Sequence, residues 1–272
     1  MPTDPILLVG AGRMGGALLK GWIAKGLTPV IAVEPKPSPE LLKLARRARV
    51  LIVPSIDAVK VKRVRACVIA LKPQILRTEA VRLNTIARSG ALMLSIAAGT
   101  TIAFLREACG ARARIVRAMP NTPGSIGRGI TAIFAAKGVT AKDKALAESL
   151  LTALGETVWV QREAQIDTVT AVSGSGPAYV FLLVEALADA AGAEGMPRKI
   201  AERLARATIT GAGALLDAEA TDPAQLRQNV TSPGGTTEAA LNVLMAEDGL
   251  TALIRRAVAA ANRRAEELGR LS

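Results

Sequence analysis

The chain has 272 residues, half of them hydrophobic, and a formal net charge of +12. A chain of this length can bury an ample core and is expected to form two domains. It contains no histidine and only two cysteines, which excludes Ser-His-Asp and Cys-His catalysis, zinc sites that use histidine, and a disulfide framework.

These exclusions narrow the chemistry that the chain can perform. Any acid–base step must rely on carboxylates, lysine, the single tyrosine Tyr179, a thiol, a hydroxyl or water. Such a set suits reactions in which a bound cofactor performs the difficult step. Cys67 and Cys109 are too few for a structural zinc site, and we expect no bound metal.

The composition also indicates where in the cell the protein is expected to be. No uninterrupted apolar run reaches membrane-spanning length, and Met1–Pro5 lacks the basic region of a signal peptide. The low cysteine content fits a reducing cytoplasm. We therefore expect a cytoplasmic protein with no membrane partner.

The positive charge raises the question of nucleic acid. Aromatic residues make up only 2% of the chain, which argues against a base-stacking surface. Solvated helix faces are the simpler interpretation, so no nucleic-acid partner is expected, and the positive field would still attract an anionic dinucleotide. The basic clusters are Arg46, Arg47 and Arg49, and Lys60, Lys62, Arg63 and Arg65.

Strands and helices alternate up to about residue 160, which predicts a parallel sheet covered on both faces. The predicted strands are Ile6–Val9, Val30–Val33, Val50–Val53, Cys67–Leu71, Ala91–Ile96, Ile115–Val116, Thr131–Phe134 and Glu156–Val160. The predicted helices are 17–25, one that starts at Pro39 behind the N-cap Ser38, Pro73–Ile86, and one from the Thr140–Asp143 capping box to Ala153.

After Val160 the pattern is helical throughout. The predicted helices are Pro177–Ala193, Pro197–Glu219, Pro223–Asn229, Gly235–Met245 and 248–268. Their apolar residues are dense and partly all-round, which is typical of helices buried in a large core or against another subunit. We predict an α/β Rossmann-type N-terminal domain at 1–160, followed by an all-α C-terminal dimerisation domain at 161–272.

A glycine turn, Gly10-x-Gly12-x-x-Gly15, follows the first predicted strand and opens a helix. In this context the pattern favours dinucleotide binding over a tight turn without ligand, with the second glycine admitting the pyrophosphate. Glu34 lies at the end of the second strand, where an acid accepts the ribose 2′-hydroxyl of NAD. Lys36 and Ser38 follow and could instead contact a 2′-phosphate, so NAD and NADP stay open.

Three further segments have both a functional and a structural interpretation. Leu71-Lys72-Pro73 ends a strand, where backbone should touch the cofactor, although Lys72 is equally well explained as a surface lysine. Met119–Pro123 is either a rigid loop whose Asn121 can donate and accept hydrogen bonds, or only a structural turn. Ser173–Pro177 is more simply a helix cap and close-packing device than a site.

The segment Val230–Thr237 concentrates hydroxyls, glycines and a proline at a predicted helix start. Glycines let backbone approach a ligand, and a helix N-terminus offers unpaired N–H groups and a positive dipole end. The segment therefore predicts a second anion site, for an acidic small-molecule substrate.

Taken together, these motifs resemble the pyrroline-5-carboxylate reductase family nearly end to end. The motifs that carry the resemblance are the glycine turn, Leu71–Gln74, Ser95–Gly99, Arg117–Pro123, Ala171–Tyr179 and Asn229–Thr237. The resemblance implies a Rossmann domain, a helical domain that interlocks in a homodimer, further assembly into rings of dimers, and reduction of 1-pyrroline-5-carboxylate to L-proline with NADPH or NADH.

The resemblance also implies which residues form the sites. Cofactor-binding residues would be Val9, Gly10, Ala11, Gly12, Arg13, Met14, Glu34, Leu71, Lys72, Ala97 and Asn229. Substrate-binding residues would be Glu163, Ser232, Gly234, Gly235, Thr236 and Thr237. We assign Thr237 the catalytic role of a hydrogen bond to the ring nitrogen.

Two departures from the family bear on the cofactor. Glu34 stands where NADP-preferring relatives often have a small hydroxyl residue, and Ile56 stands where some relatives have an asparagine near the adenosine ribose. Both weaken the expectation of a strong NADP preference.

Two other classes of protein fit parts of the sequence. A β-hydroxyacid dehydrogenase or related imine reductase shares the plan, but these dehydrogenases depend on a lysine in the helical half, where this chain has only Lys199, beside a predicted helix start. A Rossmann-based dinucleotide-sensing or nucleic-acid-binding protein would use the basic clusters and would need no substrate segment.

Overall fold

The computed structural model describes residues 4–60 and 63–270. The basic residue Lys62 and part of Met1–Pro5 fall outside this description. The chain divides into two compact units, Met1–Gly174 with Ala261–Ser272, and Ser175–Ala260. The first unit extends beyond the predicted boundary at 160 because α6 (Gln165–Val169) packs against strands of the sheet.

The first unit is built on one eight-stranded sheet with the order β3-β2-β1-β4-β5-β6-β7-β8. Its strands are β1 Ile6–Val9, β2 Val30–Val33, β3 Val50–Val53, β4 Ala66–Ile69, β5 Leu92–Ser95, β6 Arg114–Met119, β7 Gly129–Ala135 and β8 Gly155–Trp159. All neighbours are parallel except β6 and β7, which are antiparallel. The predicted parallel sheet is thus present, with this pair as the one departure from it among the described strands. The physical reason is that a short loop with a 3-10 turn, Thr122–Ile126, joins β6 and β7, whereas a parallel pair needs a longer crossover.

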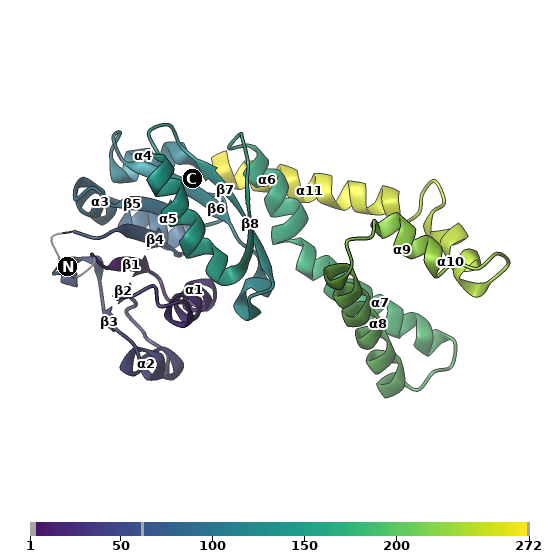
Figure 1. Cartoon of the computed structure of the whole chain (residues 1–272). Coiled ribbons are helices and arrows are strands. Elements are labelled where there is room, and N and C mark those ends of the chain that lie inside the picture. Colours follow the sequence, from purple (N-terminus) through teal and green to yellow (C-terminus); the bar gives the residue numbers. More distant parts are fainter. Residues whose placement is uncertain (1–3, 61–62, 271–272) are drawn as a thin grey trace. The chain divides into compact units, whose positions relative to one another are not determined.

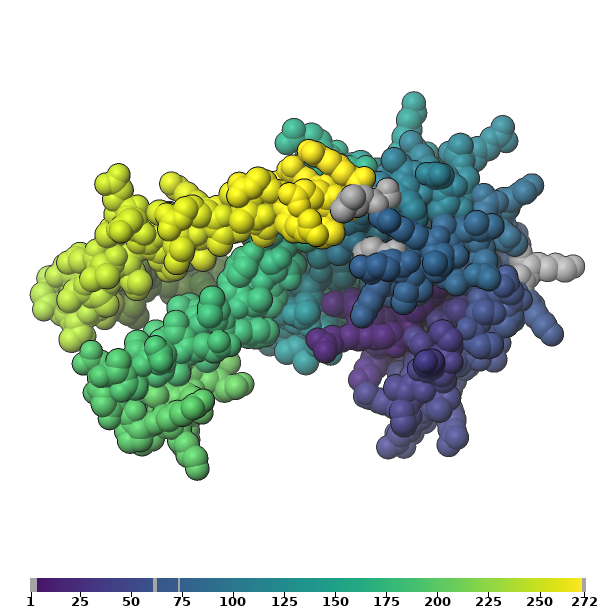
Figure 2. Space-filling view, turned by 180° about the vertical axis from the view of Figure 1, so that it is seen from behind, coloured from purple at the N-terminus to yellow at the C-terminus, as the bar shows by residue number. Residues whose placement is uncertain are grey.

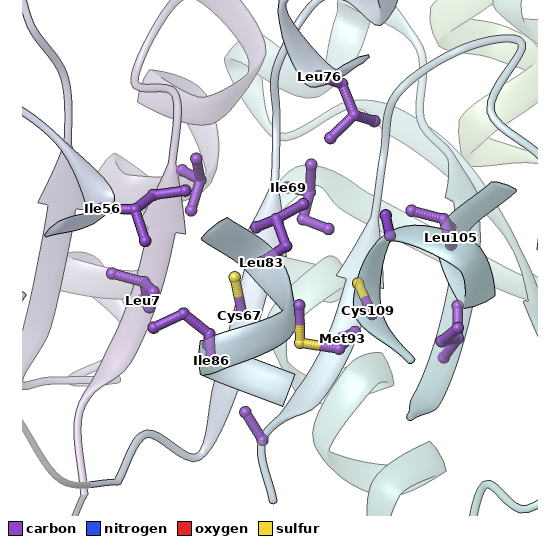
Figure 3. Packing of buried hydrophobic residues seen from close by; sticks show 14 of the residues in the cluster. Leu7, Ile56, Cys67, Ile69, Leu76, Leu83, Ile86, Met93, Leu105 and Cys109 are labelled. Carbon is purple, nitrogen blue, oxygen red and sulfur yellow. The ribbon is translucent and has the colours of Figure 1, made fainter. Parts of the chain in front are cut away.

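Helices cover both faces of this sheet (Figure 1). The residues of β1 alternate between the faces, so Ile6 and Leu8 belong to one core and Leu7 and Val9 to the other. The first core is completed by α1 (Arg13–Ala24), α2 (Pro39–Arg46) and α5 (Ala141–Leu151), and the second by α3 (Pro73–Arg88) and α4 (Ile102–Cys109). In the second core, Leu83 of α3 and Met93 of β5 gather around Cys67 (Figure 3).

Local signals set several helix starts. Ser38 caps α2 by accepting a hydrogen bond from the Leu41 N–H, with Pro39 in the first turn. Thr140 and Asp143 form the capping box at the start of α5. Both caps were predicted and are confirmed. The helix α4 was not predicted, although Thr101 caps it through a bond from the Phe104 N–H.

The second unit consists of helices whose hydrophobic side chains are largely uncovered within the chain. Its helices are α7 Gly176–Ala193, α8 Arg198–Ala218, α9 Pro223–Asn229, α10 Thr236–Leu244 and the first part of α11 (Leu250–Arg270). Helices α7 and α8 pack on each other (Figure 1). Figure 2 draws the helices of this unit in green to yellow. Yet none of the residues of α7 is buried, and Phe181 is 61% and Val243 73% exposed. Such faces need a covering partner.

One stretch of the described chain is long and apolar enough to cross a bilayer, by length and composition alone. It runs from Gln165 to Ala193, and 6% of its most apolar window is buried. This stretch is not an uninterrupted apolar run, because the acidic residues Glu185 and Asp189 lie within it. A criterion based on uninterrupted runs therefore does not detect it. The same property is expected of a helix that a second subunit covers.

Candidate functional site

The glycine turn joins β1 to α1 at the carboxyl end of the sheet. Gly10 has φ +92°, and a Cβ there would lie 2.8 Å from the Ala70 carbonyl oxygen. A Cβ on Gly15 would collide with the Gly10 carbonyl oxygen, whereas one on Gly12 would meet open space. The first and third glycines are therefore required for packing, and the open side of the second leaves room for a ligand to approach the backbone.

Glu34 directly follows β2 and bonds to the glycine turn. Its Oε2 accepts a hydrogen bond from the Ala11 N–H at 3.0 Å, and its Oε1 accepts one from the Lys36 N–H at 3.2 Å. The turn therefore presents a backbone donor that holds an anionic oxygen. Ala11 and Glu34 are 23 positions apart in the sequence, but they can form this hydrogen bond because β1 and β2 are neighbours in the sheet.

A hollow of about 470 Å³ opens beside this turn. Lys20 and Glu40 of its lining form an ion pair at 2.6 Å. Arg13 and Lys36 also line it, and neither has an ion-pair partner within the described part of the chain. The hollow thus offers two uncompensated cations beside the acidic Glu34. Its lining residues are Ala11, Gly12, Arg13, Gly16, Ala17, Lys20, Glu34, Lys36, Ser38, Glu40, Leu41, Leu44 and Ser125.

The other predicted cofactor residues of the first unit follow adjacent strands. Val9 ends β1, Leu71 lies two residues after β4, and Ala97 lies two residues after β5. Because β1, β4 and β5 are parallel neighbours, their carboxyl ends share one edge of the sheet. Lys72 is exposed and occupies the N-cap position of α3 without a side-chain capping bond. This edge is where doubly wound sheets bind ligands.

Glu163 is placed in the first unit and bonds to protein groups. Its Oε1 accepts hydrogen bonds from the Ile102 N–H at 2.7 Å and from Arg117 Nη1 at 3.1 Å. Arg117 also donates to Asp167. Sequence reasoning did not assign Arg117 or Asp167 a role, although a charged residue between the buried apolar residues of β6 was a signal available in the sequence.

The second predicted anion turn lies in the helical unit, between α9 and α10. Gly234 has φ +68°, and its N–H donates to Glu238 Oε2 at 2.7 Å. A Cβ on Gly235 would lie 2.8 Å from Ser232 Oγ, which explains the glycine. Thr236 begins α10. Like the glycine turn, this turn holds a carboxylate of the chain on a backbone N–H.

The remaining residues of this segment differ in their bonding. Asn229 ends α9, and its Oδ1 accepts a hydrogen bond from Gln225. Thr237 is half-buried in the first turn of α10. Among the described residues its hydroxyl has no hydrogen-bond partner, so it is available to a ligand.

The other two motifs make bonds and contacts within the protein. Asn121 Oδ1 accepts a hydrogen bond from the Ile130 N–H, which fixes the loop after β6. Ser173 does not cap α7; its hydroxyl bonds to the Val169 carbonyl within a π-helical turn, Thr170–Gly174. A Cβ on Gly174 would lie 2.8 Å from Met119 Cε, so the predicted close packing is present.

Neither cysteine is suited to acid–base chemistry. Both are buried. Burial raises the pKa of Cys67 far above its ordinary value, to which the nearby Cys109 adds, and burial raises the pKa of Cys109 to about 12. Both side chains are therefore neutral thiols at physiological pH. Among the described residues no group of three or more acidic, cysteine or histidine side chains could hold a metal ion.

Two family models match the chain. Residues 163–268 match the model described as pyrroline-5-carboxylate reductase dimerisation. Residues 5–99 match one described as NADP oxidoreductase coenzyme F420-dependent. The two matches fall on the helical half and on the glycine-turn half respectively.

Full-length relatives agree with these matches. A pyrroline-5-carboxylate reductase of Pseudomonas aeruginosa is 39% identical over 269 residues, covering 98% of each chain. The solved structure of such a reductase from Coxiella burnetii is 37% identical, with a TM-score of 0.87 and 98% coverage of each chain. A Plasmodium falciparum pyrroline carboxylate reductase with NADP bound is 29% identical, with a TM-score of 0.79 and 99% coverage of each chain.

These similarities extend over the whole chain and include both the glycine turn and the helical segment. They confirm the Rossmann-type fold, the dimerisation domain and the NAD(P)H-dependent oxidoreductase activity expected from the sequence. The chain belongs to the pyrroline-5-carboxylate reductase family.

Proposed function

We propose that the glycine-turn edge binds the cofactor and that Ser232–Thr237 binds the substrate in this pyrroline-5-carboxylate reductase, which acts in proline biosynthesis. One observation carries the assignment. Each turn holds a carboxylate of the chain on a backbone N–H: Glu34 on Ala11, and Glu238 on Gly234. Both turns therefore present a backbone donor that holds an anionic oxygen, which supports anionic ligands at both.

The cofactor edge fits a dinucleotide. The open side of Gly12 lets a pyrophosphate approach the backbone, and the start of α1 supplies the positive end of a helix dipole. The other proposed cofactor residues of the first unit are Val9, Gly10, Arg13, Met14, Leu71, Lys72 and Ala97. Asn229, in the helical unit, is proposed as a cofactor residue on the family resemblance alone. When bound, NADPH or NADH supplies the hydride that reduces the imine carbon of 1-pyrroline-5-carboxylate to give L-proline.

The substrate segment needs to orient the ring and to hold its carboxylate. We assign the carboxylate to the backbone N–H groups around Gly234 and Gly235, with Ser232 and Thr236 beside them. The free hydroxyl of Thr237 is assigned to the ring nitrogen. A protonated imine is already a strong electrophile, so positioning and exclusion of water contribute more than proton transfer. A reaction that depends on positioning more than on proton transfer suits a chain without histidine.

Glu163 remains a proposed neighbour of the substrate on the strength of the family resemblance. Its Oε1 is engaged by Ile102 and Arg117. Any ligand contact would therefore use its other oxygen, which has no bond among the described residues. The bonds made by Oε1 support an additional role, which is developed below.

The preference between NADPH and NADH depends on the charges around the hollow. Glu34 opposes a 2′-phosphate, whereas Arg13 and Lys36 attract it. Both carboxylate oxygens of Glu34 bond to backbone N–H groups, which lowers the repulsion it exerts. We propose that the enzyme accepts both cofactors and that Glu34 reduces the advantage of NADPH.

We further propose that the working form is a homodimer, which can assemble into rings of dimers, in the cytoplasm. The uncovered hydrophobic faces of α7 and α10 support a covering subunit. The low aromatic content supports the absence of a nucleic-acid partner, and a covering subunit accounts for the apolar Gln165–Ala193 stretch without a membrane. Sedimentation of the purified protein at several salt concentrations tests the assembly.

One assay tests the proposed reaction. Addition of 1-pyrroline-5-carboxylate to the purified protein should cause consumption of NADPH or NADH, with proline identified as the product. Absence of proline with both cofactors, at concentrations that a relative uses efficiently in a parallel assay, would reject the proposal.

A further inference from the structure

An ionic network around one buried arginine and two half-buried carboxylates joins β6 to the segment 163–167, at the start of α6, in the first unit. The Arg117 side chain is 3% exposed, with Nη1 at 3.1 Å from Glu163 Oε1 and Nη2 at 3.0 Å from Asp167 Oδ1. The same Glu163 oxygen accepts the Ile102 N–H at 2.7 Å. One guanidinium thus links two carboxylates, and one of these continues to the start of α4.

Stability alone is a weak explanation for this network. Taking charges out of water is costly, and a buried ion pair often stabilises a fold no better than apolar residues of the same volume. The other central residues of β6, Ile115, Val116 and Ala118, are buried and apolar. A charged residue among them therefore points to a requirement for fixed geometry, which a planar guanidinium with two bonded carboxylates supplies.

The geometry that the network fixes is that of the turn between β5 and α4. Arg117 lies beside Ser95 in the sheet register. Ser95 Oγ in turn accepts the Ala97 N–H at 3.3 Å. Glu163 then holds the far end of the turn through Ile102. The network therefore bonds to one end of the segment that contains Ala97, and its arginine is the sheet neighbour of Ser95 at the other end.

The end of α11 also packs against the β5–α4 turn. Gly99 has φ +67°, and a Cβ there would lie 3.2 Å from Leu268 Cβ. Gly269 lies beside Thr101, since a Cβ on it would be 3.6 Å from Thr101 Cγ2. The turn is thus held by Glu163, which precedes the helical unit in the chain, and by the end of α11, which follows it.

We propose that Arg117 and Asp167 are positioning residues of this reductase. Acting through Glu163, they hold the β5–α4 turn in the conformation in which Ala97 contacts the cofactor. The inference rests on the proposed function, because it takes this turn as part of the cofactor edge. It assigns Glu163 an effect on the cofactor that a substrate contact alone would not produce.

The experiment measures cofactor affinity without substrate. Dissociation constants for NADH and NADPH are obtained by fluorescence titration of wild type, Asp167→Asn and Glu163→Gln, together with hydrogen exchange of the amides at 97–102. Both variants should raise the cofactor Kd by about tenfold, equivalent to about 1.4 kcal/mol, and should speed exchange at Ile102. Asp167→Asn is the more informative variant, because it keeps the Glu163–Ile102 bond and changes only the anchoring of Arg117.

The chain contains a matched control. Arg82 also bonds to one aspartate and one glutamate, Asp57 at 2.9 Å and Glu79 at 3.1 Å, but this arginine and Asp57 are exposed, unlike Arg117, and Glu79 is half-buried. Asp57→Asn should leave the cofactor Kd and the exchange at 97–102 unchanged.

Three results would overturn the inference. The first is a wild-type cofactor Kd and wild-type exchange in both variants. The second is a rise in KM for 1-pyrroline-5-carboxylate with an unchanged cofactor Kd, which would make Glu163 a substrate contact only. The third is an equal loss of affinity in Asp57→Asn, which would indicate a general charge effect. Failure of wild type to bind either cofactor would instead reject the proposed function on which the inference rests.

Discussion

At the scale of single residues, the two anion turns depend on a few atoms. Gly12 leaves the backbone open to a ligand. Gly234 and Ala11 each present an N–H that already holds a carboxylate. Thr237 adds a hydroxyl that has no partner among the described residues. Single substitutions at these positions therefore test the proposed roles with little change to the rest of the structure.

Thr237→Ala tests the catalytic assignment. The change removes one hydroxyl from the first turn of α10 and leaves the buried cores untouched, so the fold should persist. Loss of a hydrogen bond that orients the reacting group should lower kcat/KM for 1-pyrroline-5-carboxylate by about a hundredfold. Steady-state kinetics measure the effect, and Thr251→Ala, at an exposed threonine of α11, is the control. A variant with the kcat/KM of wild type would remove Thr237 from the mechanism.

Glu34→Ser tests the cofactor preference. Removing the carboxylate leaves Glu40, which is paired with Lys20, as the remaining acid of the described lining, so Arg13 and Lys36 can attract a 2′-phosphate more strongly. KM for NADPH should therefore fall by roughly tenfold relative to KM for NADH. The ratio of kcat/KM for the two cofactors measures the effect. Glu40→Gln is the matched control, because Glu40 lines the same hollow but pairs with Lys20. An unchanged ratio in Glu34→Ser would show that this residue does not select the cofactor.

At the scale of elements, helix starts and strand ends place the functional groups. The start of α5 illustrates how a local signal is reinforced by tertiary contacts. Asp143 closes the capping box with Thr140 and also pairs with Arg114 of β6 at 2.6 Å. Arg114 in turn donates to the Gly90 carbonyl. The capping residue Asp143, which was predicted from the sequence, thus also anchors β6 through Arg114. The capping box alone does not predict this second contact.

Asp143 makes the stability of this region dependent on pH. Burial alone would raise the pKa of this carboxyl, but hydrogen bonds from Thr140 and the Arg114 guanidinium outweigh it and hold the pKa below its ordinary value. Because the folded pKa is lowered, the stabilisation is present above the unfolded pKa and is lost as the pH falls through the folded pKa.

Asp143→Asn should therefore lower the free energy of unfolding by about 2 kcal/mol at about pH 7, and the difference from wild type should shrink at about pH 3. Urea denaturation at the two pH values measures both effects. Asp57→Asn, at an exposed carboxylate, should have little effect on stability at about pH 7. A difference for Asp143→Asn that persists undiminished in acid would contradict the assigned role of its charge.

At the scale of the whole molecule, the helical unit carries hydrophobic surface that the chain itself does not bury. Phe181 and Leu182 of α7 and Val243 of α10 are more than half exposed, in the region that matches the dimerisation model. Burying such surface against a second subunit stabilises the assembly by roughly 25 cal/mol for each Å² of apolar area removed from water. The fold of this unit is therefore expected to depend on the dimer.

Phe181→Glu tests this dependence. Phe181 is 61% exposed on α7, and a charge there would be buried without a partner in the dimer, which should shift the protein toward monomers. Sedimentation equilibrium measures the change. Val81→Glu is the control, because Val81 is 84% exposed but lies on α3 of the first unit. Equal dissociation by both changes, or by neither, would contradict the assignment of the interface to α7.

The sequence by itself determined the elements whose cause is local. Hydrophobic runs bounded by turns located the eight strands, capping residues located the starts of α2 and α5, and the glycine spacing identified the first anion turn, because these patterns depend on neighbours in the chain. Only the tertiary structure decided the antiparallel pairing of β7, the bond from Ala11 to Glu34, and the network around Arg117. These contacts join residues far apart in sequence, and their geometry is set by which strands lie side by side in the sheet.

The substrate segment depended on both the sequence and the structure. Its residue types indicated an anion site, whereas only the structure showed that the Gly234 N–H holds the Glu238 carboxylate. This bond exists because the turn folds back onto the start of α10.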